Sequence, residues 1–291
     1  MNKNAMIRPN PTQENQFFRL PDGRRLGYAE YGVPEGSTVL FFHGAPGSRH
    51  IHADMARASA QCGVRLIAVE RPGYGLSDPQ PGRTMLDWPE DVAALLGALG
   101  IAQFAIIGFS GGSPYALACA YRLPGQVTKI ALVGTLAPLD VPGVTAGISP
   151  AVSGLYSLAQ ANPDALRNTL AAIAPTPLAL AEAMSASATG WDRNVMNARH
   201  AEFETEYTQT LHTGVEGVAS DFVLASQSWG FPLDGINTEA HLWCGTADCN
   251  TPPAMADYIA SRLQNSHLFR LADEGHFVLY GHWEEILRRL V

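Results

Sequence analysis

Positive charge is sparse in this sequence and is nowhere concentrated. The 19 Lys and Arg residues are outnumbered by 27 Asp and Glu residues, the formal net charge is −8, and no Lys/Arg run exceeds two residues. Proteins that bind nucleic acid or anionic membranes carry concentrated basic patches. We therefore expect neither partner for this chain.

Cysteine is also scarce. The four cysteines, Cys62, Cys119, Cys244 and Cys249, form no C-x-x-C pair, and no histidine pair follows the last two at zinc-binding spacing. Secreted disulfide-rich domains and structural zinc sites need such patterns. The sequence therefore predicts a reduced, cytoplasmic protein without a metal site.

Long apolar segments are missing as well. No window of about 18 residues is both apolar and free of charge, which is what a membrane-spanning helix requires. The polar start MNKNAMIRPNPTQENQ lacks the apolar stretch of a secretory signal. We expect no membrane span, no signal peptide, and a loose tail over about the first 15 residues.

What the sequence does contain is an alternation of strand-like and helix-like segments. Continuous apolar runs indicate strands buried on both faces, and Ala/Leu-rich stretches between them indicate helices. A hairpin is expected at 17–32, strands at 38–43, 64–70, 104–109, 127–135, 241–248 and 267–273, and helices at 52–63, 86–100, 113–124, 253–264 and 282–291. This order predicts an α/β fold with a mostly parallel sheet and helices on both faces.

The alternation is interrupted once. Residues 137–235 are rich in Ala and Leu, contain no convincing strand, and are divided by Pro, Gly and Asn. We interpret them as a helical cap inserted between residues 1–136 and 236–291, which form the two parts of the α/β core. No basic side chains are concentrated in this insertion.

The segment Gly108-Phe109-Ser110-Gly111-Gly112 lies where a strand should end and a helix should begin. A serine on such a sharp turn points outward at the sheet edge, and side chains two residues before and after it would meet neighbouring backbone. The G-x-S-x-G pattern in this context indicates a nucleophilic serine at position 110.

Three other loops supply what a nucleophilic serine needs. Asp248 and His276 each follow a late strand, so their side chains should meet Ser110 at the carboxyl edge of the sheet. The loop of residues 43–47 follows an early strand. Because Pro46 has no N–H, Ala45 and Gly111 are the expected amide donors to an oxyanion.

These segments together resemble the α/β-hydrolase superfamily, in its capped esterase and prolyl iminopeptidase-like branch. The matching motifs are HGAPG (43–47), ERPGYGLSD (70–78), GFSGG (108–112), GTAD (245–248) and EGHF (274–277). The resemblance implies an eight-stranded sheet, a structural role for Tyr74 and Ser77, and a Ser110–Asp248–His276 triad. Related epoxide hydrolases and dehalogenases have Asp at position 110, so Ser110 disfavours those two activities.

Some residues compete with these assignments. Asp140 also follows a strand and is an alternative to Asp248 as the acid, which we disfavour because GTAD fits the usual acid loop. His43, before a glycine turn, is interpreted as an anchor of its loop rather than as a base. In the insertion, Phe203, Tyr207 and Trp191 are candidate substrate contacts together with Phe109 of the elbow.

The resulting hypothesis is a serine hydrolase without metal or organic cofactor, acting on a small or medium uncharged ester. Alternatives are a prolyl iminopeptidase-like aminopeptidase, an acyltransferase, and a non-catalytic ligand receptor on the same fold. An aminopeptidase needs a carboxylate for the substrate amine, and only Glu202, Glu204 and Glu206 offer one. If that segment is helical, Glu202 and Glu206 share a face, which we interpret as solvated.

Overall fold

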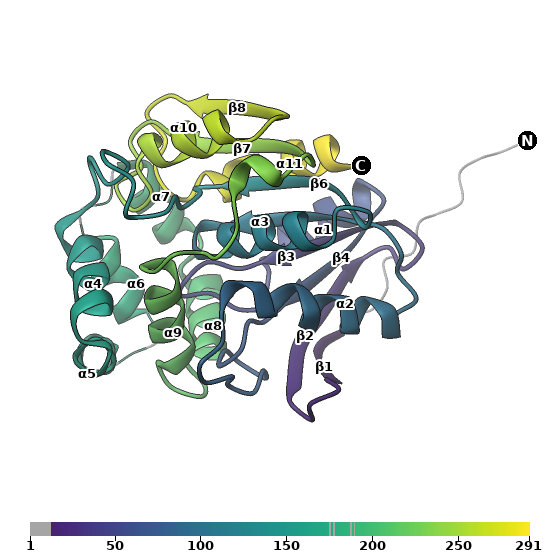
Figure 1. The fold of residues 1–291 in the computed structure, drawn as a ribbon, viewed down its shortest axis with the longest axis horizontal. Coiled ribbons are helices and arrows are strands. Elements are labelled where there is room, and N and C mark those ends of the chain that lie inside the picture. Colours follow the sequence, from purple (N-terminus) through teal and green to yellow (C-terminus); the bar gives the residue numbers. More distant parts are fainter. Residues whose placement is uncertain (1–12, 175, 177, 187, 189) are drawn as a thin grey trace, which may run out of the picture.

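One eight-stranded sheet organises the protein in a computed structural model, which describes residues 13–291 except 175, 177, 187 and 189 (Figure 1). The strand order is β1-β2-β4-β3-β5-β6-β7-β8. The strands are β1 (Gln13–Arg19), β2 (Arg25–Gly32), β3 (Ser37–Phe42), β4 (Val64–Val69), β5 (Phe104–Phe109), β6 (Val127–Val133), β7 (Glu239–Gly245) and β8 (Ser266–Leu271). β2 is antiparallel to β1 and β4, and all other pairs are parallel. The predicted fold class is confirmed.

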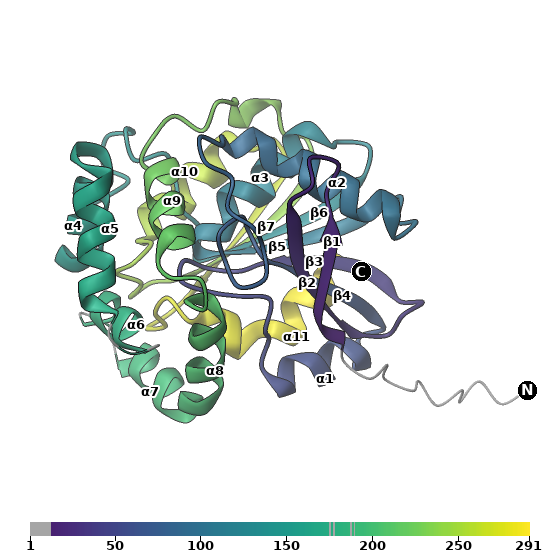
Figure 2. The same ribbon diagram turned by 90° about the horizontal axis from the view of Figure 1, so that it is seen from below.

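Helices cover both faces of the sheet (Figure 2). One face carries α1 (Ala53–Gln61) and α11 (Val278–Leu290), and the other carries α2 (Trp88–Ala98), α3 (Ser113–Arg122) and α10 (Pro253–Arg262). Alternate side chains of β3 pack on opposite faces of the sheet. Leu40 and Phe42 belong to the apolar cluster on one face, and Val39 and Phe41 belong to the cluster on the other. The continuous apolar runs therefore reflect strands buried on both faces.

In the part of the chain that the structure describes, six α-helices lie between β6 and β7 and gather on one side of the sheet, at the left in Figures 1 and 2. We call this segment, residues 137–235, the helical insertion. Its helices are α4 (Pro150–Ala161), α5 (Pro163–Ile173), α6 (Ala179–Met184), α7 (Gly190–Ala198), α8 (His200–Thr210) and α9 (Glu216–Ala225). The described residues of the insertion contain no strand, and Leu155, Leu166, Leu170 and Phe222 form a small core of their own.

The chain start differs from the expectation. Residues 1–12 of the expected loose tail lie outside the described residues, but residues 13–15 already belong to β1, which pairs with β2. The three-residue 3₁₀ helices Met85–Asp87, Ser110–Gly112 and Leu233–Gly235 complete the elements.

Candidate active site

Ser110 occupies a strained turn between β5 and α3. Its φ angle is +51°, a left-handed conformation that is uncommon for residues other than glycine. A Cβ atom at Gly108 would lie 2.8 Å from Cα of Ser113, and one at Gly112 would overlap the carbonyl oxygen of Phe42. The flanking glycines therefore allow the turn that projects the serine from the sheet edge.

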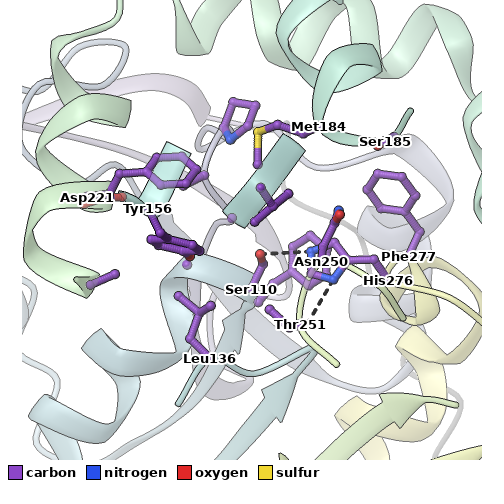
Figure 3. Close-up of a pocket in the computed structure, with 18 of the residues that line it drawn as sticks. Ser110, Leu136, Tyr156, Met184, Ser185, Asp221, Asn250, Thr251, His276 and Phe277 are labelled. Atoms are coloured by element: carbon purple, nitrogen blue, oxygen red, sulfur yellow. Dashed lines mark hydrogen bonds between the residues drawn. The ribbon is translucent and has the colours of Figure 1, made fainter. Parts of the chain in front are cut away.

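The structure brings Ser110, His276 and Asp248 together in a hydrogen-bonded series. Oγ of Ser110 lies 2.9 Å from Nε2 of His276 (Figure 3). Nδ1 of His276 lies 2.9 Å from Oδ2 of Asp248. The three residues come from the loops after β5, β8 and β7, where parallel strands end at one edge. Asp140, the competing acid, is exposed.

The Asp248 carboxylate accepts further hydrogen bonds that hold it in place. Oδ1 accepts from the backbone N–H groups of Asn250 and Thr251, at 2.8 Å each. The Thr251 hydroxyl donates to Oδ2 at 2.7 Å and also lies 3.1 Å from Nδ1 of His276. Sequence reasoning missed Thr251, although its position three residues after Asp248 is the local turn pattern that Asp side chains favour.

The charge balance around His276 favours a basic imidazole. Burial alone would lower the pKa of His276, but the charge and hydrogen bond of Asp248, with a smaller contribution from Asp192, raise that pKa above its ordinary value. The bond to Asp248 favours the tautomer with hydrogen on Nδ1. Nε2 then faces Ser110 as an acceptor.

The other half of the site is the loop of residues 43–47. A Cβ atom at Gly111 would lie 3.0 Å from Cβ and 3.4 Å from N of Ala45, so the two expected amide donors belong to adjoining segments. The buried imidazole of His43 contacts the carbonyl of Gly44 through Nδ1 at 2.8 Å. Its pKa is well below the ordinary value, chiefly because burial disfavours its charged form. A neutral ring in these contacts suits an anchor of the loop.

A buried cluster of charged side chains contacts the backbone of the 43–47 loop. Arg71 donates to the carbonyl oxygens of His43 and Gly44, at 2.5 and 2.8 Å, and to Asp221 of α9 at 2.8 Å. Asp221 also pairs with Arg83 at 2.8 Å. Burial would raise the pKa of Asp221, but the two arginines lower it to about 2. The carboxylate is therefore ionised and fully engaged.

The hydroxyls of Tyr74 and Tyr115 complete the cluster, donating to Asp221 at 2.7 and 2.6 Å. Ser77 bonds the carbonyl oxygen of Glu70 at 2.7 Å and accepts from the N–H of Gly27 at 2.8 Å. The contacts of Tyr74 and Ser77 are thus with the scaffold around the candidate site.

A cavity of about 50 Å³ opens beside Ser110 and His276 (Figure 3). The insertion contributes much of its wall, including Val152, Tyr156, Met184, Tyr207 and Phe222. Of the four residues proposed to contact substrate, Phe109 and Tyr207 line the cavity, whereas Trp191 and Phe203 do not. The Phe203 ring is buried and stacks on the ring of Tyr207, with 5.7 Å between the ring centroids. The Trp191 ring lies against Gly281 of α11.

The glutamates of α8 do not face this cavity. Glu202 and Glu204 are exposed, but Glu206 is buried, with Oε2 3.7 Å from Nε2 of His52. The interpretation of Glu206 as solvated is wrong, because α8 packs this face against the segment before α1. Among the described cavity-lining residues, Asp221 carries the only carboxylate, and Arg71 and Arg83 already neutralise it.

Comparison with known proteins decides the family. The family model described as alpha/beta hydrolase fold matches residues 37–282, most of the chain. The chain belongs to this family. The α/β-hydrolase assignment agrees with the sheet order, the turn at Ser110 and the order of the three candidate residues in the chain.

Individual relatives carry several different names. The chain is 36% identical over 126 residues to a non-heme chloroperoxidase of Streptomyces lividans, covering 43% of this chain and 46% of that protein. It is 34% identical to a proline iminopeptidase of Xylella fastidiosa, covering 42% and 39%. The matched segments therefore span less than half the length of these relatives.

A longer match joins the chain to a pimeloyl-[acyl-carrier protein] methyl ester esterase of Aromatoleum aromaticum, at 29% identity over 77% of this chain and 84% of that protein. Among solved structures, the enol-lactonase of Burkholderia xenovorans superposes with a TM-score of 0.71 at 19% identity, covering 94% and 97% of the two chains. That likeness supports the fold.

Two further features bear on the kinds of site that the described residues form. No helix among them is both long and apolar enough to cross a membrane. Within the same residues, no group of three or more His, Cys, Asp or Glu side chains is arranged to hold a metal ion.

Proposed function

We propose that this α/β-hydrolase is a serine hydrolase that cleaves a small or medium uncharged carboxylic ester through an acyl-enzyme. The observation that carries the proposal is the unbroken hydrogen-bonded series from Ser110 through His276 to Asp248 at the wall of a cavity. Nucleophile, base and orienting acid stand within hydrogen-bond reach of one another, as this chemistry requires.

In the acylation step, Ser110 Oγ attacks the ester carbonyl and its proton passes to Nε2 of His276. The C–O π electrons move onto the carbonyl oxygen, where the N–H groups of Ala45 and Gly111 would stabilise the negative charge. Asp248 holds the Nδ1–H tautomer and stabilises the imidazolium that forms.

The tetrahedral intermediate then collapses, and His276 returns the proton to the departing alcohol. Water activated by Nε2 of His276 attacks the acyl-Ser110 ester in the second half-reaction. This attack releases the carboxylic acid and restores the serine. No step requires a metal or an organic cofactor.

The proposed substrate class follows from the cavity wall. Phe109, Tyr207, Val152 and Phe222 offer apolar surface to an acyl group, with the insertion acting as a cap. An anionic or cationic substrate group would be buried there without a free partner, which is costly. The esterase relative, with its long coverage, favours the same reaction class.

The test combines covalent labelling with turnover of p-nitrophenyl acetate to hexanoate. Wild type should react with a fluorophosphonate probe and hydrolyse these esters, and Ser110→Ala should do neither. Ser261→Ala, a change at an exposed serine of α10, is the matched control and should behave as wild type.

Each alternative gives a distinct result. Faster release of p-nitroaniline from prolyl-p-nitroanilide than of p-nitrophenol from the esters would favour an aminopeptidase. Ester products formed from added alcohol would favour an acyltransferase. Absence of both labelling and turnover in the folded wild type would favour a receptor, and labelling retained in Ser110→Ala would overturn the nucleophile assignment.

A further inference from the structure

A carboxylate from the helical insertion contacts the loop that carries His276. Asp192, in the first turn of α7, is only 2% exposed. Its Oδ2 accepts a hydrogen bond from the backbone N–H of His276 at 3.0 Å, and its Oδ1 accepts from the N–H of Phe277 at 2.9 Å. One side chain therefore satisfies two successive amides of the loop between β8 and α11, 84 residues further along the chain.

The contact is closely fitted. A Cβ atom at Gly275 would overlap the Asp192 carboxylate, so the loop backbone approaches Asp192 more closely than any side chain would permit. The two amides belong to the N-cap residue of α11, Phe277, and to the residue before it, so neither has an acceptor within the helix. A buried backbone N–H without an acceptor costs free energy, so the position of the Asp192 carboxylate favours one backbone position for this loop.

Asp192 also acts on His276 through its charge. The charged groups that face His276 are Asp248, from the loop after β7, and Asp192, from α7. Both raise the pKa of the imidazole, although only Asp248 touches the ring. Burial raises the pKa of Asp192 itself, and the two amide donors oppose that effect by favouring the ionised carboxylate.

We propose that Asp192 is a positioning residue, through which docking of the insertion sets the backbone at His276 and aims its imidazole between Ser110 and Asp248. This inference rests on the proposed function, but it adds a dependence of the catalytic base on the insertion. The insertion would then complete the catalytic machinery as well as cover the cavity.

The test compares Asp192→Asn with Asp164→Asn. The Asn side chain keeps the size of Asp192 but loses its charge and one acceptor. Asp164 also lies in the first turn of an insertion helix, α5, but it is exposed and pairs only with Arg167 among the described contacts. The readouts are kcat and KM for p-nitrophenyl acetate, the rate of fluorophosphonate labelling, and an NMR titration of the His276 imidazole in the Ser110→Ala background.

Misplacement of a catalytic group by about 1 Å can cost roughly 100-fold in rate. We expect Asp192→Asn to lower kcat by about 10- to 100-fold, with KM changed less than about threefold. The His276 titration should move to lower pH because one of its two facing carboxylates is gone. Asp164→Asn should match wild type in all three readouts.

A folded Asp192→Asn variant with wild-type kcat and an unshifted titration overturns the inference. If Asp192→Asn does not fold, Gly275→Ala decides, because it crowds the same contact while keeping the charge. Folded Gly275→Ala with wild-type kcat overturns the inference, as does failure of both variants to fold, which would make the contact purely structural. The NMR titration separates this inference from the proposed function, since it needs no turnover.

Discussion

At the scale of single residues, the candidate acid is distinguished by its neighbours. Asp248 accepts two backbone N–H groups and a threonine hydroxyl besides contacting His276, so its carboxylate has one orientation. Asp140, which the sequence offers as an alternative, is exposed within the loop between β6 and α4. Of these two aspartates, Asp248 is the one that contacts Nδ1 of His276, and this contact supports it as the proposed acid that leaves Nε2 free to accept a proton.

Replacing the acid should therefore reveal which aspartate acts. Losing the orienting carboxylate of a triad can lower turnover about 10⁴-fold. We expect a loss of this order in kcat for Asp248→Asn and nearly wild-type kcat for Asp140→Asn, measured with p-nitrophenyl acetate. Circular dichroism of both variants controls for folding. A larger loss in Asp140→Asn would assign the acid to the loop after β6.

At the scale of elements, α9 joins the insertion to the candidate oxyanion loop through Asp221. This carboxylate faces Arg71 and Arg83, both buried, and Arg71 bonds the carbonyls of His43 and Gly44. Removing one partner of a buried ion pair leaves an uncompensated charge, and the cost exceeds the net worth of the pair.

Asp221→Asn should consequently destabilise the protein by about 3–5 kcal/mol. Urea unfolding at neutral pH, followed by circular dichroism, measures this as a lower midpoint at unchanged slope. Asp164→Asn, which removes an exposed insertion carboxylate paired with Arg167, should cost less than about 1 kcal/mol. Equal losses in the two variants would contradict a special role for the buried cluster.

Features encoded by neighbouring residues could be predicted from the sequence, whereas contacts between distant segments could not. The strands, the turn at Ser110 and the loops after β7 and β8 are encoded locally, by apolar runs and by glycines next to polar residues. Asp192 and Asp221 were missed because their partners lie 84 and 150 residues away, and nothing nearby in the chain marks them. Glu206 was misjudged for a related reason, since helical spacing groups residues on a face but does not say what covers that face.

At the scale of the whole molecule, the proposed base makes activity dependent on pH. His276 must be neutral to accept the serine proton, and its pKa is raised above the ordinary 6.5. A raised pKa keeps the imidazole protonated to higher pH, so activity is lost as pH falls through that value. The site therefore favours neutral to alkaline conditions.

The expected profile of kcat/KM for an uncharged ester rises with pH to a plateau, with its midpoint above 6.5. Because the substrate does not titrate, the midpoint reports the free enzyme. Asp140→Asn, at an exposed site, should leave it unmoved. A profile that is flat from about pH 5 to 8 would rule out His276 as the general base.

The enclosure of the site by the insertion sets the final expectation, which concerns acyl chain length. The cavity beside Ser110 is small, at about 50 Å³, and Met184 of α6 forms part of its wall, so we expect short acyl chains to fit it best. Across p-nitrophenyl esters, kcat/KM should be highest between acetate and hexanoate and fall for longer chains and for triglyceride emulsions.

Met184→Ala should raise kcat/KM for the longer esters by roughly 10-fold, since one methylene in an apolar pocket is worth about 1–3 kcal/mol. Met196→Ala is the matched control, because that half-buried methionine of α7 packs against the core and does not line the cavity. If long-chain emulsions are preferred by the wild type, or if both methionine variants shift the profile equally, the insertion does not limit the acyl chain at this wall.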